Sequence, residues 1–278
     1  MKIVLALLAA TIVSSAAFSQ NNLKVPAPSP SATVKQDFGL SSVEVSFSRP
    51  GVKGRKIFGD LVPYDKVWRT GANSPTLITF GDDVTIGGTK VPAGKYGLIT
   101  IPGQQEWTVI ITKSTDVSGP SGYKEANDVV RVKVKPIELP FPVETFNILF
   151  DNIKPTSMDA IIMWDRTVVP FTITTDIDGK VTAQIDQLMK SDKPPYFQAA
   201  MYYMETGKDL NKAVEWMDKA IQENPKAFWI YHNKANALAK QGKKKEAAEA
   251  AQKSIELAKE ARNDDYVTLN EKLLVTLK

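Results

Sequence analysis

The alternation of apolar and polar positions along the chain changes its period once, near residue 177. Upstream, apolar and polar residues alternate in short runs, as Val43, Val45 and Phe47 do with the polar residues between them. Such alternation is typical of half-buried strands, and turn-forming residues separate the runs. Downstream, apolar positions recur at helical spacing. The pattern predicts an all-β antiparallel sandwich or barrel over residues 32–178, followed by an all-α domain.

The first domain is predicted to contain short strands, each with one apolar face. These strands cover residues 43–48, 76–80, 83–86, 95–101, 106–112, 129–134, 144–150, 158–164 and 167–175. Strands do not alternate with helical patterns in this region, so a doubly wound α/β sheet is not expected.

The second domain is predicted to consist of helices throughout. A helix and a linker fill residues 179–194, and the helical-repeat domain covers 195–278. Gly207, Pro225 and Gly242 break the pattern where helices are expected to end. The predicted helices of the repeat domain are 196–206, 210–223, 228–240, 244–260 and 264–277.

An internal repeat is visible in the helical domain. Ala213 and Ala247 are 34 positions apart, and so are Ala220 and Ser254, within two stretches that align with each other. This period, with small residues where paired helices approach closely, resembles a divergent pair of tetratricopeptide repeats. Two repeats are fewer than the roughly three that such arrays need for stability. We therefore expect the repeats to dock on the β-domain or on a second copy of the chain.

The N-terminus has the pattern of an export signal. Lys2 precedes an apolar run from residue 3 to 13, and Ala17-Phe18-Ser19 fits the rule for cleavage after a small residue. The sequence predicts a signal peptide over residues 1–19 and a proline-rich linker over 20–31; an uncleaved anchor is the alternative. No later apolar run is long enough to span a bilayer, so a periplasmic or secreted protein without a membrane span is expected.

Composition narrows the chemistry that this chain can perform. It has no cysteine, which excludes thiol catalysis, disulfides and cysteine-based metal or iron–sulfur sites. Its one histidine, His232, makes histidine-based catalysis or metal binding unexpected. The net charge of +4 over 278 residues does not indicate nucleic-acid binding. We accordingly expect neither a metal nor a cofactor.

Residues 49–76 form the segment with the most distinctive chemistry. They combine six cationic side chains and two acidic ones with Phe58, Tyr64 and Trp68. An arginine offers a planar fork for a carboxylate or phosphate, and a tryptophan can stack on a sugar. The segment is therefore a candidate loop for an anionic or glycan-like ligand. The candidate ligand-binding residues are Arg49, Lys53, Arg55, Trp68, Arg69, Thr70 and Asn73.

A purely structural interpretation of the same segment stays open. In it, Arg69 pairs with Asp60 or Asp65, and Trp68 fills the core. The remaining cations would then be solvated side chains of a hairpin turn.

The motifs of the β-domain resemble those of a known family. WRTGAN at Trp68–Asn73, VPAGKY at Val91–Tyr96 and EWTVI at Glu106–Ile110 resemble the bacterial family catalogued as domain of unknown function 2911. The resemblance runs from about Ser29 to Asp176. It implies an exported protein of a kind common in Bacteroidetes, in which C-terminal helical repeats also occur. The family has no established activity, and Ser74 stands where its members commonly have glutamate.

These features predict an exported, non-enzymatic binding or scaffold protein. Its expected partners are an envelope protein or a small anionic or glycan-like ligand. The alternative is a hydrolase of envelope glycans or peptides that uses carboxylate chemistry.

Overall fold

The computed structural model describes residues 25–277 of the chain. The predicted signal peptide and residues 20–24 of the predicted linker lie outside the described residues. Among the described helices, none is long and apolar enough to cross a membrane.

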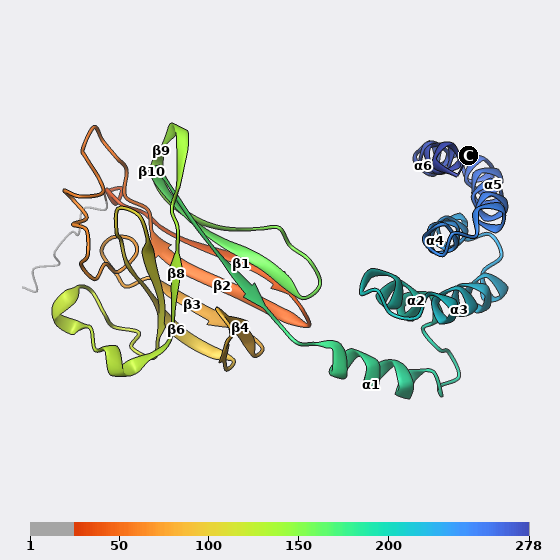
Figure 1. Ribbon diagram of the computed structural model, residues 1–278, viewed down its shortest axis with the longest axis horizontal. Coiled ribbons are helices and arrows are strands. Elements are labelled where there is room, and N and C mark those ends of the chain that lie inside the picture. The colour runs from red at the N-terminus through yellow and green to blue at the C-terminus, as the bar shows by residue number, and fades with distance from the viewer. Residues whose placement is uncertain (1–24, 278) are drawn as a thin grey trace, which may run out of the picture.

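The N-terminal domain contains two antiparallel sheets, which is the sandwich alternative of the prediction (Figure 1). One sheet has six strands in the order β1-β2-β3-β6-β7-β8, and the other has four in the order β5-β4-β10-β9. The strands are β1 (Ser31–Phe38), β2 (Ser41–Ser48), β3 (Leu77–Phe80), β4 (Val84–Ile86), β5 (Thr89–Val91), β6 (Gly94–Ile101), β7 (Trp107–Thr112), β8 (Asp128–Val134), β9 (Ile137–Asp151) and β10 (Ser157–Thr174).

The core lies between the two sheets and follows the alternation in the sequence. Val45 on β2 stands opposite Ile78 on β3, and both are buried. On the facing sheet, Ile162 on β10 stands opposite Ile148 on β9, and both are buried too. These side chains belong to one hydrophobic cluster. Because the strand period is two, the register that buries these residues leaves the alternate residues facing outward.

Four features of the sheets differ from the sequence-based expectation, and one of them is that β9 begins at Ile137 rather than at residue 144. β1 was missed because it is an edge strand whose alternate residues are exposed, so its apolar pattern is weak. The three-residue β5 was also missed, since it is too short to show a period. The strands expected at 158–164 and 167–175 form one long strand, β10, with register shifts on either side of Asp165.

The long β9 also carries a bulge beside these register shifts. Glu138 stands opposite Thr167 and Val143 opposite Asp165, so β9 has more residues than β10 between the two pairs. The excess includes Pro140 and Pro142. Proline has no N–H to donate to the ladder, which explains why β9 leaves regular pairing here.

The predicted helices are confirmed. They are α1 (Asp178–Leu188), α2 (Tyr196–Glu205), α3 (Leu210–Glu223), α4 (Phe228–Lys240), α5 (Lys244–Glu260) and α6 (Asp264–Thr276). α3 and α5 begin 34 residues apart, as the repeat predicts. Ala213 of α3 and Ala247 of α5 are fully buried, and these small side chains allow close packing of helix pairs.

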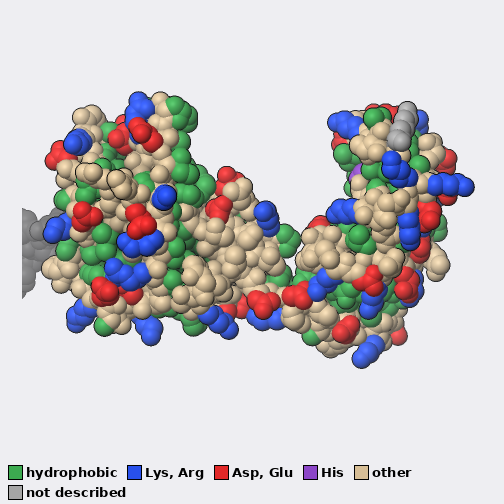
Figure 2. Space-filling model, in the orientation of Figure 1, with side chains coloured by type: hydrophobic (Ala, Val, Ile, Leu, Met, Phe, Trp, Pro, Cys, Tyr) green, Lys and Arg blue, Asp and Glu red, His purple; other side chains and the backbone are tan. Residues whose placement is uncertain are grey.

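Of the two alternatives expected for the repeats, docking onto the β-domain is not what the structure shows, and docking on a second copy of the chain stays a prediction. Among residues 25–277, the buried apolar clusters of the two domains share no side chain. α1 connects the domains instead, and Figure 2 shows a narrow junction between them. At this junction Lys180 of α1 pairs with Asp82 of the β-domain at 2.7 Å. Asp178 accepts hydrogen bonds from Tyr202 and Lys208 of the helical domain.

A buried polar network holds α6 against the rest of the helical domain. Asn270 of α6 is fully buried and donates to the Ser254 hydroxyl of α5 at 2.9 Å. Its side-chain oxygen lies 2.9 Å from His232 Nδ1 of α4, and Asn236 lies 3.0 Å from the other ring nitrogen. Because Asn270 Nδ2 is engaged as a donor, its oxygen must accept, so Nδ1 of the imidazole carries the proton. His232 is therefore a structural histidine that joins α4 to α6.

Replacing Asn270 by alanine should destabilise the helical domain. The change removes the acceptor of the His232 Nδ1–H and the donor to the Ser254 hydroxyl. A buried donor left without an acceptor costs about 1–3 kcal/mol. Chemical denaturation monitored by helical circular dichroism measures the loss. Asn233→Ala is the matched control, since Asn233 is partly exposed on α4. Its side-chain amide donates to the Trp229 carbonyl of its own helix and to no other group among the described residues. Equal losses in the two variants would contradict the role given to the network.

Candidate functional site

The 49–76 loop connects β2 to β3 at the end of the sandwich remote from the helices (Figure 1). Backbone hydrogen bonds tie it to both sheets. Val52 N–H donates to Glu144 of β9 at 2.7 Å, and Trp68 exchanges two backbone hydrogen bonds with Thr100 of β6 at 2.8 and 3.0 Å. The loop is therefore a fixed part of the frame despite its length.

Trp68 anchors the loop in an aromatic cluster. Its ring stacks on Trp164 of β10 with centroids 6.0 Å apart and an interplanar angle of 15°. Phe58, Trp107 and Phe146 meet it edge-on. The indole N–H donates to the Gly71 carbonyl at 3.0 Å. The Trp68 ring thus packs chiefly against side chains of this protein, as the purely structural interpretation of the loop predicts.

Thr70 stands in an unusual backbone conformation just after the anchor. Its φ is 57°, a left-handed value that is a genuine outlier for a β-branched residue. Thr70 is fully buried, its hydroxyl lies 3.0 Å from that of Thr100, and its carbonyl accepts from Thr76. At Gly71, where φ is 154°, an added Cβ would lie 3.0 Å from the Thr76 hydroxyl. The surrounding structure therefore imposes the strained geometry on this segment.

The side chains of Arg49 and Arg55 bind backbone carbonyls, while Lys53 is held by its own backbone N–H. Arg49 Nε donates to the Phe146 carbonyl at 3.1 Å. Arg55 folds back on its own turn and donates to the carbonyls of Gly51 and Val52 at 2.6 and 3.0 Å. Lys53 contributes its backbone N–H, which donates to Glu144.

Arg69 does not pair with Asp60 or Asp65, the partners considered in the structural interpretation. Its Nη1 donates to the Ser118 carbonyl at 2.5 Å. Its Nε is buried and has no hydrogen-bond acceptor among residues 25–277. Asn73 turns away and donates to the Ser29 carbonyl at 3.2 Å. Arg69 is thus a partly buried cation whose one hydrogen-bond partner within residues 25–277 is a neutral carbonyl.

A cavity of about 240 Å³ adjoins this arginine, and we call it the Arg69 cavity. Among the candidate residues, it brings together Arg55, Trp68 and Arg69, while the other four do not line it. Sequence reasoning missed Trp164, which shares the wall. Its alternation with Ile162 looked like that of an ordinary core residue, so no periodic signal singled it out. The lining residues are Ser29, Pro50, Arg55, Leu61, Val62, Trp68, Arg69, Gly71, Ala72 and Trp164.

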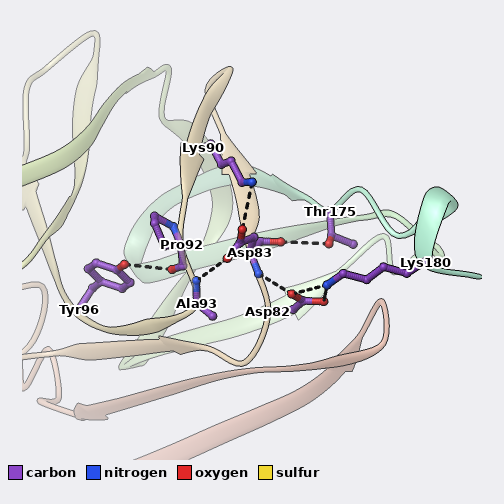
Figure 3. Close-up of polar contacts among 8 residues, drawn as sticks. All are labelled: Asp82, Asp83, Lys90, Pro92, Ala93, Tyr96, Thr175 and Lys180. Atoms are coloured by element: carbon purple, nitrogen blue, oxygen red, sulfur yellow. Dashed lines mark hydrogen bonds and ion pairs between the residues drawn. The ribbon is translucent and has the colours of Figure 1, made fainter.

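A second polar cluster lies at the other end of the domain, beside the junction (Figure 3). Asp83 accepts from the Ala93 N–H at 2.9 Å and pairs with Lys90 at 3.0 Å. Asp82 accepts from Lys180 through both of its oxygens. With Asp176 these groups line a cavity of about 270 Å³.

The charges of this cluster are internally matched. The hydrogen bond from Lys180, followed by that from the Asp83 N–H, lowers the pKa of Asp82. The Ala93 N–H and then Lys90 lower the pKa of Asp83. Nearby, burial and the hydrogen bond to Asp178 raise the pKa of Tyr202 to about 12. A general acid requires a carboxyl whose pKa is raised, so Asp82 and Asp83 suit the role of ionised structural groups.

Acid should weaken the β4–β5 region through Asp83. A carboxyl with a lowered folded-state pKa stabilises the fold fully above its ordinary value of about 3.9. That contribution is lost as the pH falls through the lower folded-state pKa. We expect Asp83→Asn to show a smaller fall in melting temperature between about pH 6 and about pH 2 than the unchanged protein. Circular dichroism at each pH measures the fall.

The matched control for this experiment is Asp60→Asn, because Asp60 is exposed and has no ion pair among the described residues. Parallel pH profiles for Asp83→Asn and the unchanged protein would show that Asp83 does not contribute in this way.

These features define a class of protein in which a β-sandwich with an ordered basic loop is joined to helical repeats. Residues 29–173, more than half of the chain, match the family described as Protein of unknown function (DUF2911), and the chain belongs to this family. Residues 194–226 and 216–249 each match the tetratricopeptide repeat. Both resemblances drawn from the sequence are thereby confirmed. No curated protein matches the chain. The repeats suggest a scaffold for protein–protein interaction.

Proposed function

We propose that this protein is an exported, non-enzymatic scaffold of the cell envelope. Its helical repeats hold a protein partner, and its β-domain offers the 49–76 loop to a small anionic or glycan-like ligand. The periplasm or the medium is the proposed location. The observation that carries the scaffold role is an aromatic surface on the repeats.

This aromatic surface, the Trp229 surface, consists of Phe228, Trp229 and Tyr266. Trp229 is the second residue of α4, and 36% of its area is exposed. Phe228 lies edge-on to it at 5.1 Å between ring centroids, and Tyr266 of α6 lies 4.9 Å from Phe228. Tryptophan and tyrosine are the residues that most often dominate the energy of protein interfaces. A tryptophan with about a third of its area exposed and two further rings beside it is a suitable anchor for a protein partner.

Binding is favoured over the hydrolase alternative by the state of the acidic groups. In the cavity lined by Asp82, Asp83 and Asp176, two of the three carboxylates are paired with lysines. The pKa values of Asp82 and Asp83 are lowered. Hydrolysis of a glycan needs a carboxylic acid with a raised pKa as its proton donor, so these two groups do not suit that role. The Arg69 cavity, by contrast, presents cations and aromatic rings, which suit recognition of an anion.

Trp229→Ala should weaken capture of the protein partner by about tenfold or more, as expected for an aromatic anchor at an interface. The measurement is cross-linking and affinity capture from the envelope fraction of the source cells, with captured proteins quantified by mass spectrometry. Circular dichroism verifies that the repeats remain folded.

Phe141→Ala is the matched control for this variant. Phe141 is an aromatic residue of the β-domain that is 59% exposed and lies outside the repeats. Capture that is unchanged by Trp229→Ala, or reduced equally by both substitutions, would remove the Trp229 surface from the proposed scaffold role.

Export predicts a defined N-terminus for the mature protein. Cleavage after Ser19 leaves Gln20 as the first residue, because the signal is removed at the small-residue site. Cell fractionation followed by N-terminal sequencing tests this. Ala17→Arg should block processing, while Ser14→Ala, which keeps a small residue, should not. A full-length cytoplasmic protein would contradict the proposal.

A further inference from the structure

The walls of the Arg69 cavity carry two positive charges that no carboxylate neutralises. Arg55 and Arg69 both line it, and neither forms an ion pair with an acidic side chain among residues 25–277. Two guanidinium groups on one small cavity repel each other, and a partly buried cation loses much of its hydration. An anion between them would remove both costs. The guanidinium fork matches a carboxylate or a phosphate in shape.

Two of the residues that line the cavity carry a buried donor without an acceptor in the described part of the chain. Trp164 is 2% exposed, and its indole N–H has no hydrogen-bond partner among the described residues. Arg69 Nε is also buried and also has no hydrogen-bond acceptor among the described residues. A buried donor left unpaired costs about 1–3 kcal/mol, so such groups are rare in folded proteins unless water or a ligand reaches them. Both donors require an acceptor of hydrogen bonds, which again indicates an oxygen-bearing group.

Two backbone irregularities converge on this cavity. The left-handed Thr70 lies between Arg69 and Gly71, which both line the cavity. Trp164 lies between Met163 and Asp165, where the pairing of β10 with β9 shifts register, and Asp165 has a φ of 51°. Bulges and strained residues of this kind re-aim side chains beside functional sites. Each of the two unpaired donors thus sits beside a local departure from regular structure.

The remaining walls of the cavity are mostly apolar. Pro50, Leu61, Val62 and Ala72 line it together with the Trp68 ring. Leu61 is 45% exposed, so part of this apolar surface faces solvent. An apolar wall beside two cations suits a ligand that has an anionic group and a hydrophobic body.

We propose that the Arg69 cavity binds a small organic acid, with its carboxylate or phosphate on Arg55, Arg69 and the Trp164 indole. The apolar body of the acid lies against Leu61 and Val62. The proposal rests on the ligand-binding half of the proposed function and names the ligand class for it. Trp164 becomes a specificity-determining residue, since its indole N–H can donate only to a ligand atom that brings a lone pair.

Nuclear magnetic resonance of the ¹⁵N-labelled full-length protein tests the site directly. Benzoate, phenyl phosphate and glucuronate are titrated against their uncharged counterparts, benzyl alcohol and methyl glucoside, and against inorganic phosphate. We expect the acids to shift the indole N–H signal of Trp164 saturably. Trp164→Phe identifies that signal by its loss. The uncharged counterparts should leave it unchanged.

Arg69→Met should weaken binding of the acids about tenfold or more, because a charge-assisted pair is lost. Lys56→Met is the matched control, since it removes an exposed cation of the same loop that does not line the cavity. Its affinity should stay within about twofold of the unchanged protein. If Arg69→Met does not fold, Ala72→Leu fills the cavity while leaving the Arg69 contact with Ser118 in place, and it should abolish the shifts.

Three results would overturn the proposal. The first is a Trp164 signal that no acid moves, which leaves only water or the protein itself to satisfy the donors. The second is an equal loss of affinity in Arg69→Met and Lys56→Met. The third is equal affinity for inorganic phosphate and the organic acids, which excludes a role for the apolar wall. In all three cases, capture that depends on Trp229 would still stand, so a failure of the ligand site is distinguishable from a failure of the scaffold.

Discussion

The packing of Trp68 between Trp164 and the rings around it is the interaction on which the β-domain's functional end depends. A connection of 28 residues between two neighbouring strands would ordinarily be mobile, because few of its backbone groups could be satisfied. Here one large side chain buries itself in the sandwich, and the two backbone hydrogen bonds with Thr100 follow from its position. Arg69, which comes next, is thereby held at the edge of the core. It lies deep enough to lose hydration and yet borders an open space.

The two ends of the β-domain differ in whether their charged side chains have partners of opposite charge. At the junction with α1, Asp82 and Asp83 each have a lysine and a backbone donor, and the Lys180–Asp82 pair is a polar contact between the domains. At the loop end, the arginines have backbone carbonyls but no carboxylate among the described residues. A matched cluster fixes structure, whereas an unmatched one leaves electrostatic free energy that a ligand can use. This contrast supports placing recognition at the loop and architecture at the junction.

In the helical domain, the residues that hold the helices together are likewise distinct from the residues proposed to bind a partner. Its small residues and the His232–Asn270 network lie inside, where they set the spacing of the helices. Trp229 lies on the surface beside them. The contacts of α1 with the β-domain include the Lys180–Asp82 ion pair. Trp229 stays 36% exposed, whereas Tyr203 and Trp216 are buried in the core of the helical domain.

The sequence by itself determined the two periodicities, the helix boundaries, the 34-residue repeat and the family, because each depends on residues close together in the chain. It also indicated that the 49–76 loop is a candidate ligand-binding segment, since the WRTGAN motif and the cations around it lie close together in the sequence. It could not choose between a sandwich and a barrel, nor place β1, whose edge position weakens its pattern. The tertiary structure alone brought Trp164, almost a hundred residues further along, against Trp68 and Arg69. Contacts between distant segments depend on the strand register and on the bulge at Asp165. The alternation of apolar and polar residues looks the same in any register and on either side of a bulge, so it cannot predict these contacts.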